Sequence, residues 1–361
     1  MRQSTDILYQ NSIGLLKELI TVPSFSKEEA ASADCIERFF QTHQIQCNRY
    51  LNNIWAMNLH FDAAKPTLLL NSHHDTVKPN KAYTLDPFTA TEKEGKLFGL
   101  GSNDAGGALV SLLAVFLYYY HEKNLAYNIV YAATAEEEIS GKNGIEALLP
   151  LLPQISCGIV GEPTEMQMAV AERGLLVLDA TATGKPGHAA RNEGENALYK
   201  AVKDINWIEN YQFAKVSDLL GPVKMTVTVI ETENKAHNVV PASCKYVIDV
   251  RVNECYSFED IISTIQLHLQ SVVEPRSMRM KPSSIPPDHP LVVSGKQLGR
   301  SCYGSPTTSD KALMPFPALK MGPGDSARSH SADEFIYLQE IKTGIDIYIA
   351  LLDQFILKQS T

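Results

Sequence analysis

Short apolar runs alternate with longer helix-like segments from about residue 54 onward, and this alternation limits the fold more than any other feature. Strands buried on both faces of a parallel sheet read as continuous apolar runs, and helices connect them. The alternation therefore predicts an α/β fold with a mainly parallel sheet flanked by helices. The expected strands cover 67–70, 127–134 and 155–160, and the expected helices cover 4–20, 26–40, 105–120 and 144–149.

A different pattern runs from residue 170 to residue 281. Strands that alternate apolar and polar residues are separated by helices, and a last edge strand is expected at 277–281, which gives the ferredoxin-like order β-α-β-β-α-β. We therefore expect one discontinuous domain at 1–169 and 282–361, interrupted by an inserted α+β domain at 170–281. The expected elements of the insert are strands at 174–183, 224–231 and 243–252 and helices at 195–211 and 257–269, the second opened by a Ser257–Asp260 capping box.

Charge and hydropathy exclude several classes of partner. With 32 Lys and Arg against 41 Asp and Glu, the formal net charge is −9, and so acidic a chain lacks the clustered cations that nucleic-acid phosphates require. The longest apolar stretch, 108–120, is shorter than the roughly 20 residues that span a bilayer. The six cysteines are scattered without a CxxC pair, as expected for reduced thiols, and the first ten residues hold no signal-peptide core. We expect a cytoplasmic protein that binds neither nucleic acid nor membrane.

Polar residues with metal-binding side chains follow the expected strands, at the sheet edge where ligands gather. His73 and Asp75 come just after the first run, and residues two apart on a strand point to one face, so that His74 points away. A neighbouring carboxylate such as Asp75 holds a metal-binding imidazole in the right tautomer. His73 is therefore a candidate metal ligand.

Further acids and one further histidine complete the set. Each has a structural interpretation of its own, since Asp104 can cap a helix and acids favour a helix start. Together, two histidines and three carboxylates supply the five protein ligands of a two-metal site with one bridging carboxylate. Imidazole and carboxylate without thiolate suit zinc, with cobalt or manganese as alternatives. The residues concerned are Asp104, the run Glu136-Glu137-Glu138, Glu162 and His330.

The motifs occur in a familiar order along essentially the whole chain. They are SHHDTV at 72–77, GLGSNDAGG at 99–107, TAEEE at 134–138, GEPT at 161–164, ERG at 172–174, GKPGHAA at 184–190, NVVP at 238–241, DVR at 249–251, TSD at 308–310 and a final GPGD…H…DE that ends at Glu334. This series resembles the co-catalytic zinc deacylase and exopeptidase family, which includes acetylornithine deacetylase, succinyl-diaminopimelate desuccinylase, aminoacylase and carboxypeptidase G.

The resemblance implies roles for the candidate residues. His73 and Glu162 would bind one metal ion, Glu138 and His330 the other, and Asp104 would bridge them. Asp75 would orient His73, and Glu137 would be the general base that activates a metal-bound water for attack on an amide.

The resemblance also implies that the inserted domain is a lid or dimerisation domain and that the protein is a homodimer. His188 would reach the active site of a dimer partner and steady the oxyanion. The residues expected to bind substrate are Arg251, Asn238, Arg173, Thr308 and Gly324.

Several positions depart from the family pattern. Ser72 replaces the usual Gly, His74 adds a second imidazole beside His73, and the segment Asn103-Asp104-Ala105-Gly106 lacks the usual Lys. Glu136 stands where Asp is usual, which leaves the register of the three-Glu run open by one residue.

The expected reaction is hydrolysis of the amide bond of an N-acyl amino acid. The motifs look most like the branch that deacylates N-acetyl- or N-succinyl-ornithine or citrulline in arginine biosynthesis. The alternatives are succinyl-diaminopimelate desuccinylase, acetyl-lysine deacetylase, aminoacylase or dipeptidase, and beyond these a non-catalytic metal-binding protein. Three cations near the motifs, Arg191, Lys311 and Arg328, are candidates to meet a succinyl carboxylate, although each is better explained by a surface charge or an internal ion pair. A serine hydrolase is disfavoured because no GxSxG motif occurs.

Overall fold

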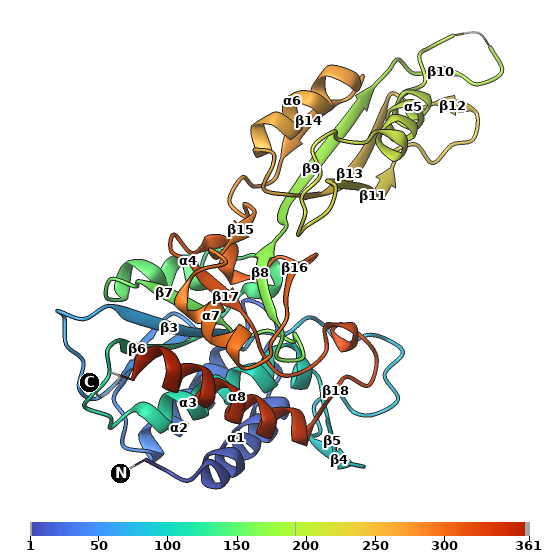
Figure 1. Cartoon of the computed structure of the whole chain (residues 1–361). Coiled ribbons are helices and arrows are strands. Elements are labelled where there is room, and N and C mark those ends of the chain that lie inside the picture. Colours follow the sequence, from blue (N-terminus) through green and yellow to red (C-terminus); the bar gives the residue numbers. More distant parts are fainter. Residues whose placement is uncertain (1, 192, 358–361) are drawn as a thin grey trace. The chain divides into compact units, whose positions relative to one another are not determined.

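Residues 2–191 and 193–357 are described by a computed structural model (Figure 1). The chain divides into two units. The first contains the chain up to Val170, Ser284–Tyr303 and the chain from Ser309 onward, and the second contains Ala171–Ser283 and Gly304–Thr308. The roles expected for the two units, catalytic and lid or dimerisation, stay predictions.

Four parallel strands form the centre of the main sheet in the first unit. They are, in spatial order, β6 (Asn128–Thr134), β3 (Thr67–His73), β7 (Cys157–Val160) and β17 (Ala318–Lys320). Antiparallel strands extend the sheet on either side, namely β2 (Asn53–Met57) and β1 (Cys47–Tyr50) beside β6, and β8 (Met168–Glu172) beside β17. Strands β15 (Ser283–Ser284) and β16 (Cys302–Ser305) both pair with β8. The mainly parallel α/β sheet predicted from the sequence is confirmed.

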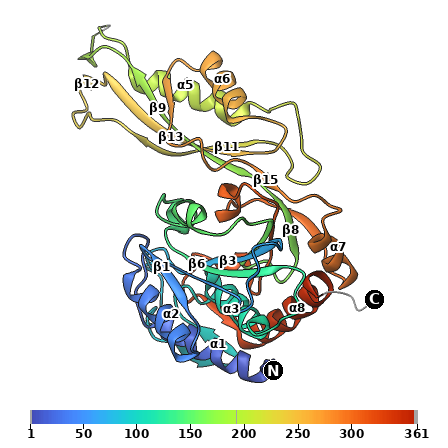
Figure 2. The same ribbon diagram turned by 90° about the vertical axis from the view of Figure 1, so that its left-hand side faces the viewer.

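Both faces of this sheet are buried, which explains why its strands read as unbroken apolar runs. Leu68 and Leu70 of β3 belong to the larger core on one face, whereas Leu69 packs with the short helix α4 (Ile145–Leu148) on the other. Figures 1 and 2 show the helices of the larger core lying along one side of the sheet. These helices are α1 (Thr5–Ile20), α2 (Ala30–Thr42), α3 (Gly107–Tyr119), α7 (Pro290–Gln297) and α8 (Leu338–Ile356).

Two details of the first unit differ from the expectation. Helix α2 starts at Ala30 rather than next to Ser26, because the Ser26 hydroxyl donates to Asp75 at 2.6 Å instead of capping a helix. A small antiparallel sheet that the sequence pattern did not indicate joins β18 (Phe335–Tyr337), β5 (Lys96–Phe98) and β4 (Thr91–Lys93). Strands of three residues are too short to show an alternating pattern.

The second unit confirms the ferredoxin-like prediction. Its elements run β9 (Gly174–Thr183), α5 (Ala197–Asn210), β11 (Lys224–Glu231), β13 (Ser243–Val252), α6 (Phe258–His268) and β14 (Val272–Pro275). The sheet order is β11-β13-β9-β14, antiparallel throughout. The predicted edge strand at 277–281 is wrong by about one strand length, since it is the apolar pair Val272–Val273 that lies beside β9.

A two-stranded antiparallel ribbon pairs β10 (Gly187–His188) with β12 (Val239–Val240) in the same unit. Short helical turns complete the chain: η1 (Ser102–Gly106), η2 (Glu137–Ile139), η3 (Leu149–Leu151), η4 (Asp310–Leu313) and η5 (Ser326–Arg328). No helix within residues 2–191 and 193–357 is long and apolar enough to cross a membrane.

Candidate active site

The carboxyl ends of three adjacent parallel strands supply most of the candidate ligands. His73 is the last residue of β3 and lies opposite Thr134, the last residue of β6. The chain that leaves β6 turns at once into η2, which carries Glu137 and Glu138, and Glu162 follows two residues after the end of β7. Because parallel strands end at one edge of the sheet, residues far apart in sequence meet there.

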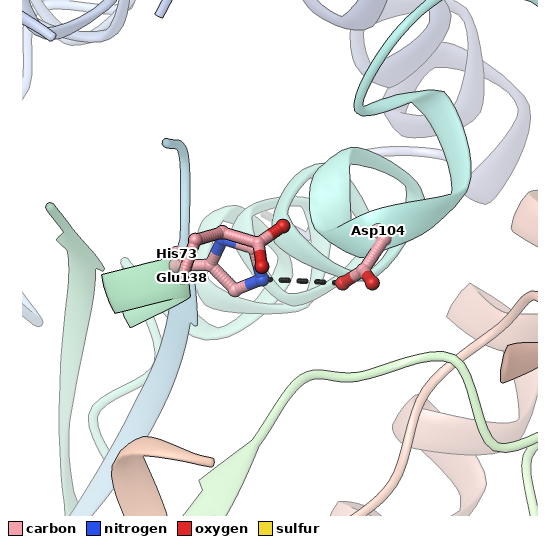
Figure 3. A group of neighbouring side chains, drawn as sticks. All are labelled: His73, Asp104 and Glu138. Atoms are coloured by element: carbon pink, nitrogen blue, oxygen red, sulfur yellow. Dashed lines mark hydrogen bonds and ion pairs between the residues drawn. The ribbon is translucent and has the colours of Figure 1, made fainter. Parts of the chain in front are cut away.

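The His73 imidazole lies at the centre of this cluster. Its Nε2 lies 3.3 Å from Asp104 Oδ1, 3.8 Å from Glu162 Oε1 and 3.9 Å from Glu137 Oε2. Figure 3 shows His73 and Asp104 facing each other with Glu138 beside them. The ring itself is buried, with 1% of the side chain exposed.

Asp104 lies between two imidazoles. Its Oδ1 faces His73, and its Oδ2 lies 3.8 Å from Nε2 of His330. The same His330 nitrogen lies 3.0 Å from Glu138 Oε2. One carboxylate oxygen directed at each histidine is the arrangement expected of a bridging ligand, with Glu162 on the His73 side and Glu138 on the His330 side.

Asp75 holds the base-bearing segment and the first histidine together. Its buried carboxylate accepts hydrogen bonds from the backbone N–H groups of Glu137 at 3.0 Å and Glu138 at 3.1 Å, and from the Ser26 hydroxyl. His73 Nδ1 lies 3.0 Å from the Asp75 carbonyl oxygen and 3.5 Å from its Oδ1. With Nδ1–H donating in this direction, Nε2 carries the lone pair toward the acids.

The two ambiguities in the motifs are resolved by hydrogen bonds. His74 points away from the acids, because its ring nitrogens lie 2.8 Å from Ser32 Oγ and 2.9 Å from the Asn52 carbonyl oxygen. Burial lowers the pKa of His74 to about 4, which keeps the ring neutral. The Glu136 side chain accepts from the Asn143 side-chain amide at 2.8 Å, so Glu137 and Glu138 are the two acids at the cluster.

The pKa values in the cluster are strongly perturbed. Burial raises the pKa of Glu137 well above its usual range, and the charges of Glu162, Asp310 and Glu138 add to this against the opposing charge of His73. Burial by itself lowers the pKa of His73, but the surrounding carboxylates outweigh it and raise the pKa well above the usual value. Several carboxylates crowded into one buried place repel one another unless cations lie among them.

The donor set fits divalent metal ions. Within the described part of the chain, His73, Asp104 and Glu138, and likewise His73, Glu137 and Glu162, offer ligand atoms that lie within 4.8 Å of one another. Zinc–nitrogen and zinc–oxygen bonds of about 2.0–2.2 Å place neighbouring ligand atoms about 3–4 Å apart. The separations around His73 and His330 have this size, and the ligands are imidazole and carboxylate without thiolate.

The second unit holds five of the six other predicted residues. His188 and Asn238 are brought together, since His188 pairs with Val239 across the two-stranded ribbon and the Ala189 N–H donates to the Asn238 carbonyl at 2.9 Å. Arg251 forms a two-point ion pair with Asp249, its Nε to Oδ1 at 2.7 Å and its Nη2 to Oδ2 at 3.0 Å. The expected grip of Arg251 on a substrate carboxylate thus competes with this pair.

Arg173 and Thr308 also lie in the second unit, and Gly324 lies in the first. The Arg173 guanidinium donates to the Leu220 carbonyl, and the Thr308 hydroxyl donates to the Arg173 carbonyl at 2.8 Å. Gly324 has φ 93°, and a Cβ there would lie 2.5 Å from Asn103 Oδ1. This glycine therefore allows the backbone to pass close to the Asn103 side chain, next to Asp104 in the sequence. The expected part of Gly324 in substrate binding stays a prediction.

Arg328 and Arg191, which were considered for a succinyl group, each pair with an acid of this chain. Arg328 makes a two-point pair with Glu340 at 2.7 and 2.9 Å, and Arg191 lies 3.7 Å from Glu193. Lys311 is buried, and its Nζ lies 3.4 Å from the Ala169 carbonyl. These contacts favour internal ion pairs for the two arginines.

Three supporting residues were not singled out as site residues from the sequence. Ser26 bonds Asp75, Asp310 accepts from the Thr134 hydroxyl at 2.8 Å, and Glu334 accepts backbone N–H groups beside Asp104. Burial raises the pKa of Glu334 to about 7, with a further contribution from the charge of Asp104. Asp310 lies in the TSD motif and Glu334 in the final DE motif, and membership of these motifs was the sequence signal that could have identified them.

Comparison with known proteins places the chain in a family. The sequence profile of Peptidase family M20/M25/M40 matches residues 69–354. Succinyl-diaminopimelate desuccinylase 2 of Ruegeria sp. (strain TM1040) is 25% identical over 280 residues, 72% of this chain and 69% of that protein. Succinyl-diaminopimelate desuccinylase of Beijerinckia indica is 25% identical over 381 residues, 95% of this chain and 98% of that protein.

Solved structures share the fold at lower identity. An M20 family metallo-carboxypeptidase from Sulfolobus solfataricus has a TM-score of 0.75 and 16% identity, covering 94% of this chain and 98% of that one. A Bacillus subtilis protein described as a dinuclear metal-binding peptidase of the M20 family has a TM-score of 0.70 and 13% identity, covering 97% of this chain and 98% of that one. The chain belongs to peptidase family M20/M25/M40 and is a metallohydrolase that acts on amide bonds.

Proposed function

We propose that this chain hydrolyses the amide bond of an N-acyl amino acid at a centre of two divalent metal ions, with zinc as the first candidate and cobalt or manganese as alternatives. The observation that carries the proposal is the position of Asp104, one of whose oxygens faces His73 and the other His330. His73 with Glu162 would hold one ion, His330 with Glu138 the other, and Asp104 both. The bound ions would supply Lewis-acid chemistry, which activates a water molecule and polarises the amide carbonyl.

Glu137 has the properties of the general base. Glu137 Oε2 lies 3.9 Å from the His73 nitrogen that faces the metal position. The residue is held in place because the Glu137 backbone N–H donates to the Asp75 carboxylate. A carboxylate at this place can take a proton from the attacking water. The same carboxyl group then passes that proton to the leaving amine, so that a carboxylate and a free amino acid are released.

His188 is proposed to stabilise the oxyanion. Its Nδ1 accepts a hydrogen bond from the Ala190 N–H at 3.2 Å, which leaves the proton of the neutral ring on Nε2. The side chain is exposed, so that Nε2–H is available as a donor. Asn238 beside it, together with Arg251, Arg173, Thr308 and Gly324, is proposed to bind the substrate.

N-succinyl-diaminopimelate is the first substrate to test. Relatives that cover most of this chain are named succinyl-diaminopimelate desuccinylases, and this supports a succinyl amide. N-acetyl- and N-succinyl-ornithine and the corresponding citrulline derivatives are the second candidates, carried by the order of the motifs. All of these substrates present an amide beside an α-carboxylate.

The test is an amine-release assay on metal-loaded protein with the five substrates, with Glu137→Ala as the inactive control. Preference for N-succinyl-diaminopimelate would support the first substrate. Preference for an ornithine or citrulline derivative would keep the chemistry and replace the first substrate with the second. Absence of cleavage of any N-acyl amino acid by protein that binds two ions would refute the proposal and favour a peptide substrate or a non-catalytic metal-binding role.

A further inference from the structure

Glu334 ends the last motif of the chain, and no step of the proposed reaction uses it. Its side chain is 2% exposed. Oε1 accepts hydrogen bonds from the backbone N–H groups of Asn103 and Asp104, both at 2.9 Å, and Oε2 accepts from the Gly101 N–H at 3.0 Å. The Glu334 carbonyl oxygen also accepts from the Gly99 N–H at 3.0 Å.

The loop 99–104 is therefore folded around the Glu334 carboxylate. Several backbone N–H groups that converge on one point form a concave anion site, and here the protein's own carboxylate fills it. Gly101 has φ 74°, and a Cβ there would lie 2.5 Å from Thr76 Cγ2, so this turn of the loop takes glycine. The glycines of the GLGSND motif thus serve the loop that presents Asp104.

The segment 330–334 supplies two parts of the metal site at once. His330 lies 3.8 Å from Asp104 Oδ2 and 3.0 Å from Glu138 Oε2. Four residues later, Glu334 fixes the backbone N–H of Asp104 itself. The position of the bridging carboxylate and the position of the second histidine are therefore set by one short piece of chain.

We propose that Glu334 is a positioning residue for the two-metal centre, acting through the 99–104 loop so that Asp104 presents one carboxylate oxygen to each metal position. The inference rests on the metal centre of the proposed function. Charge-assisted hydrogen bonds are stronger than neutral ones, and three of them on one carboxylate hold the loop more firmly than a neutral side chain can.

The test is the metal affinity of Glu334→Gln. This substitution keeps the shape of the side chain but replaces one acceptor oxygen with an NH₂ group, which then faces a backbone N–H instead of accepting from it. We expect the affinity of metal-free protein for Zn²⁺ or Co²⁺ to fall by about 10–100-fold, the usual effect of losing a residue that supports a metal ligand. Calorimetry or competition with a chelator measures it without any substrate.

Asp333→Asn is the matched control, because it removes the adjacent carboxylate. Asp333 accepts from the Thr84 and Leu85 backbone N–H groups at 2.8 and 2.9 Å and from the Thr84 hydroxyl at 2.6 Å, and none of these groups belongs to the 99–104 loop. We expect unchanged metal affinity in this variant. Equal losses of metal affinity in Asp333→Asn and Glu334→Gln would overturn the proposal. They would show that the affinity depends on the segment 330–334 as a whole and not on the contact of Glu334 with the 99–104 loop.

A double-mutant cycle tests whether Glu334 acts through Asp104. In an Asp104→Asn background, Glu334→Gln should cause little further loss of affinity, because the bridging group is already gone. Additive losses, or wild-type affinity in Glu334→Gln itself, would overturn the proposal. If Glu334→Gln does not fold, Glu334→Asp is titrated instead, with the same loss expected because its shorter side chain cannot reach all three N–H groups. Protein that binds metal but cleaves no amide would refute the proposed function and leave this titration to decide the role of Glu334.

Discussion

The residue that connects most of the candidate site is Asp75, although it is not itself a proposed metal ligand. It bonds the segment that carries Glu137 and Glu138 and lies against the ring of His73. A change at this one carboxylate therefore affects the base and two ligands together. Such outer hydrogen bonds fix the orientation of metal ligands.

Glu137→Gln should lower kcat by at least ~10²-fold, because an amide cannot take a proton from water. The metal content should stay unchanged, since the proposed ligands all remain. Steady-state kinetics and metal analysis measure the two effects. Glu136→Gln is the matched control and should keep wild-type turnover, since the Glu136 side chain bonds Asn143 rather than the site. Near-normal turnover in Glu137→Gln would exclude Glu137 as the base.

Asp75→Asn should lower the free energy of unfolding of the metal-free protein by about 1–3 kcal/mol, the cost of leaving buried partners of a charged group unsatisfied. The amide keeps one of the two carboxylate oxygens, so at most two of the three donors lose their acceptor in this variant. Ser26→Ala, which removes one of those donors, should cost about 0.5–1.5 kcal/mol. Urea unfolding measures both variants. Wild-type stability in Asp75→Asn would contradict the role given to this carboxylate.

Single residues were predictable where a strand's period of two applied. His73 faces the site, whereas His74 points away from it. This difference follows from their consecutive positions at the end of β3. The same rule applied to residues 249–251 would have paired Asp249 with Arg251 on one face of β13. The register of the three-Glu run could not be predicted, because Glu136 adopts φ 56° and breaks the strand's period. Glu334 was missed as a functional residue because its partners are backbone N–H groups, which no residue type reveals.

At the scale of elements, long strands and helices were predicted closely and short ones were not. The strands β9, β11 and β13 have the predicted bounds, because each alternates over eight or ten residues. The four-residue strand β14 was placed too late, and β1 and β2 lie outside the predicted strands. In strands this short, pairing with a neighbour rather than local pattern decides the position.

Ser257→Ala should lower the stability of the second unit by about 1 kcal/mol, the usual cost of losing a helix N-cap. The Ser257 hydroxyl accepts from the Asp260 N–H at 3.1 Å, and the Asp260 carboxylate accepts from the Ser257 backbone N–H at 3.1 Å. Trp207 stacks on His268 at the end of α6, so its fluorescence in a Trp55→Phe background reports the unfolding of this unit.

Thr264→Ala is the control for this helix, because the Thr264 hydroxyl donates to the Asp260 carbonyl of the same helix rather than capping its end, and alanine has the higher helix propensity. We expect it to leave the stability of the second unit unchanged or slightly raised. A Ser257→Ala protein as stable as the wild type would show that the cap does not contribute to α6.

At the scale of the whole molecule, the metal ligands lie in the first unit and His188 lies in the second. We expect a homodimer in which His188 serves the active site of the other subunit. A mixture of His188→Ala and Asp104→Asn subunits should then hydrolyse amides although neither variant does so alone, because one site of the mixed dimer has intact residues of both kinds.

The control mixture combines Asp104→Asn with Glu138→Gln, both of which damage the metal site of their own subunit. This pair should stay inactive after subunit exchange. A confirmed mixed dimer of the first pair without activity, or a protein that is monomeric when active, would contradict the shared site.

The most direct test of the central claim is to add Zn²⁺ or Co²⁺ stepwise to metal-free protein and to measure bound metal and amine release from N-succinyl-diaminopimelate and the ornithine and citrulline derivatives together. We predict that two ions bind per chain, that cleavage of one of these amides appears as they bind, and that Asp104→Asn loses both. Full occupancy by two ions without cleavage of any of these amides, or cleavage that does not depend on metal, would contradict the account.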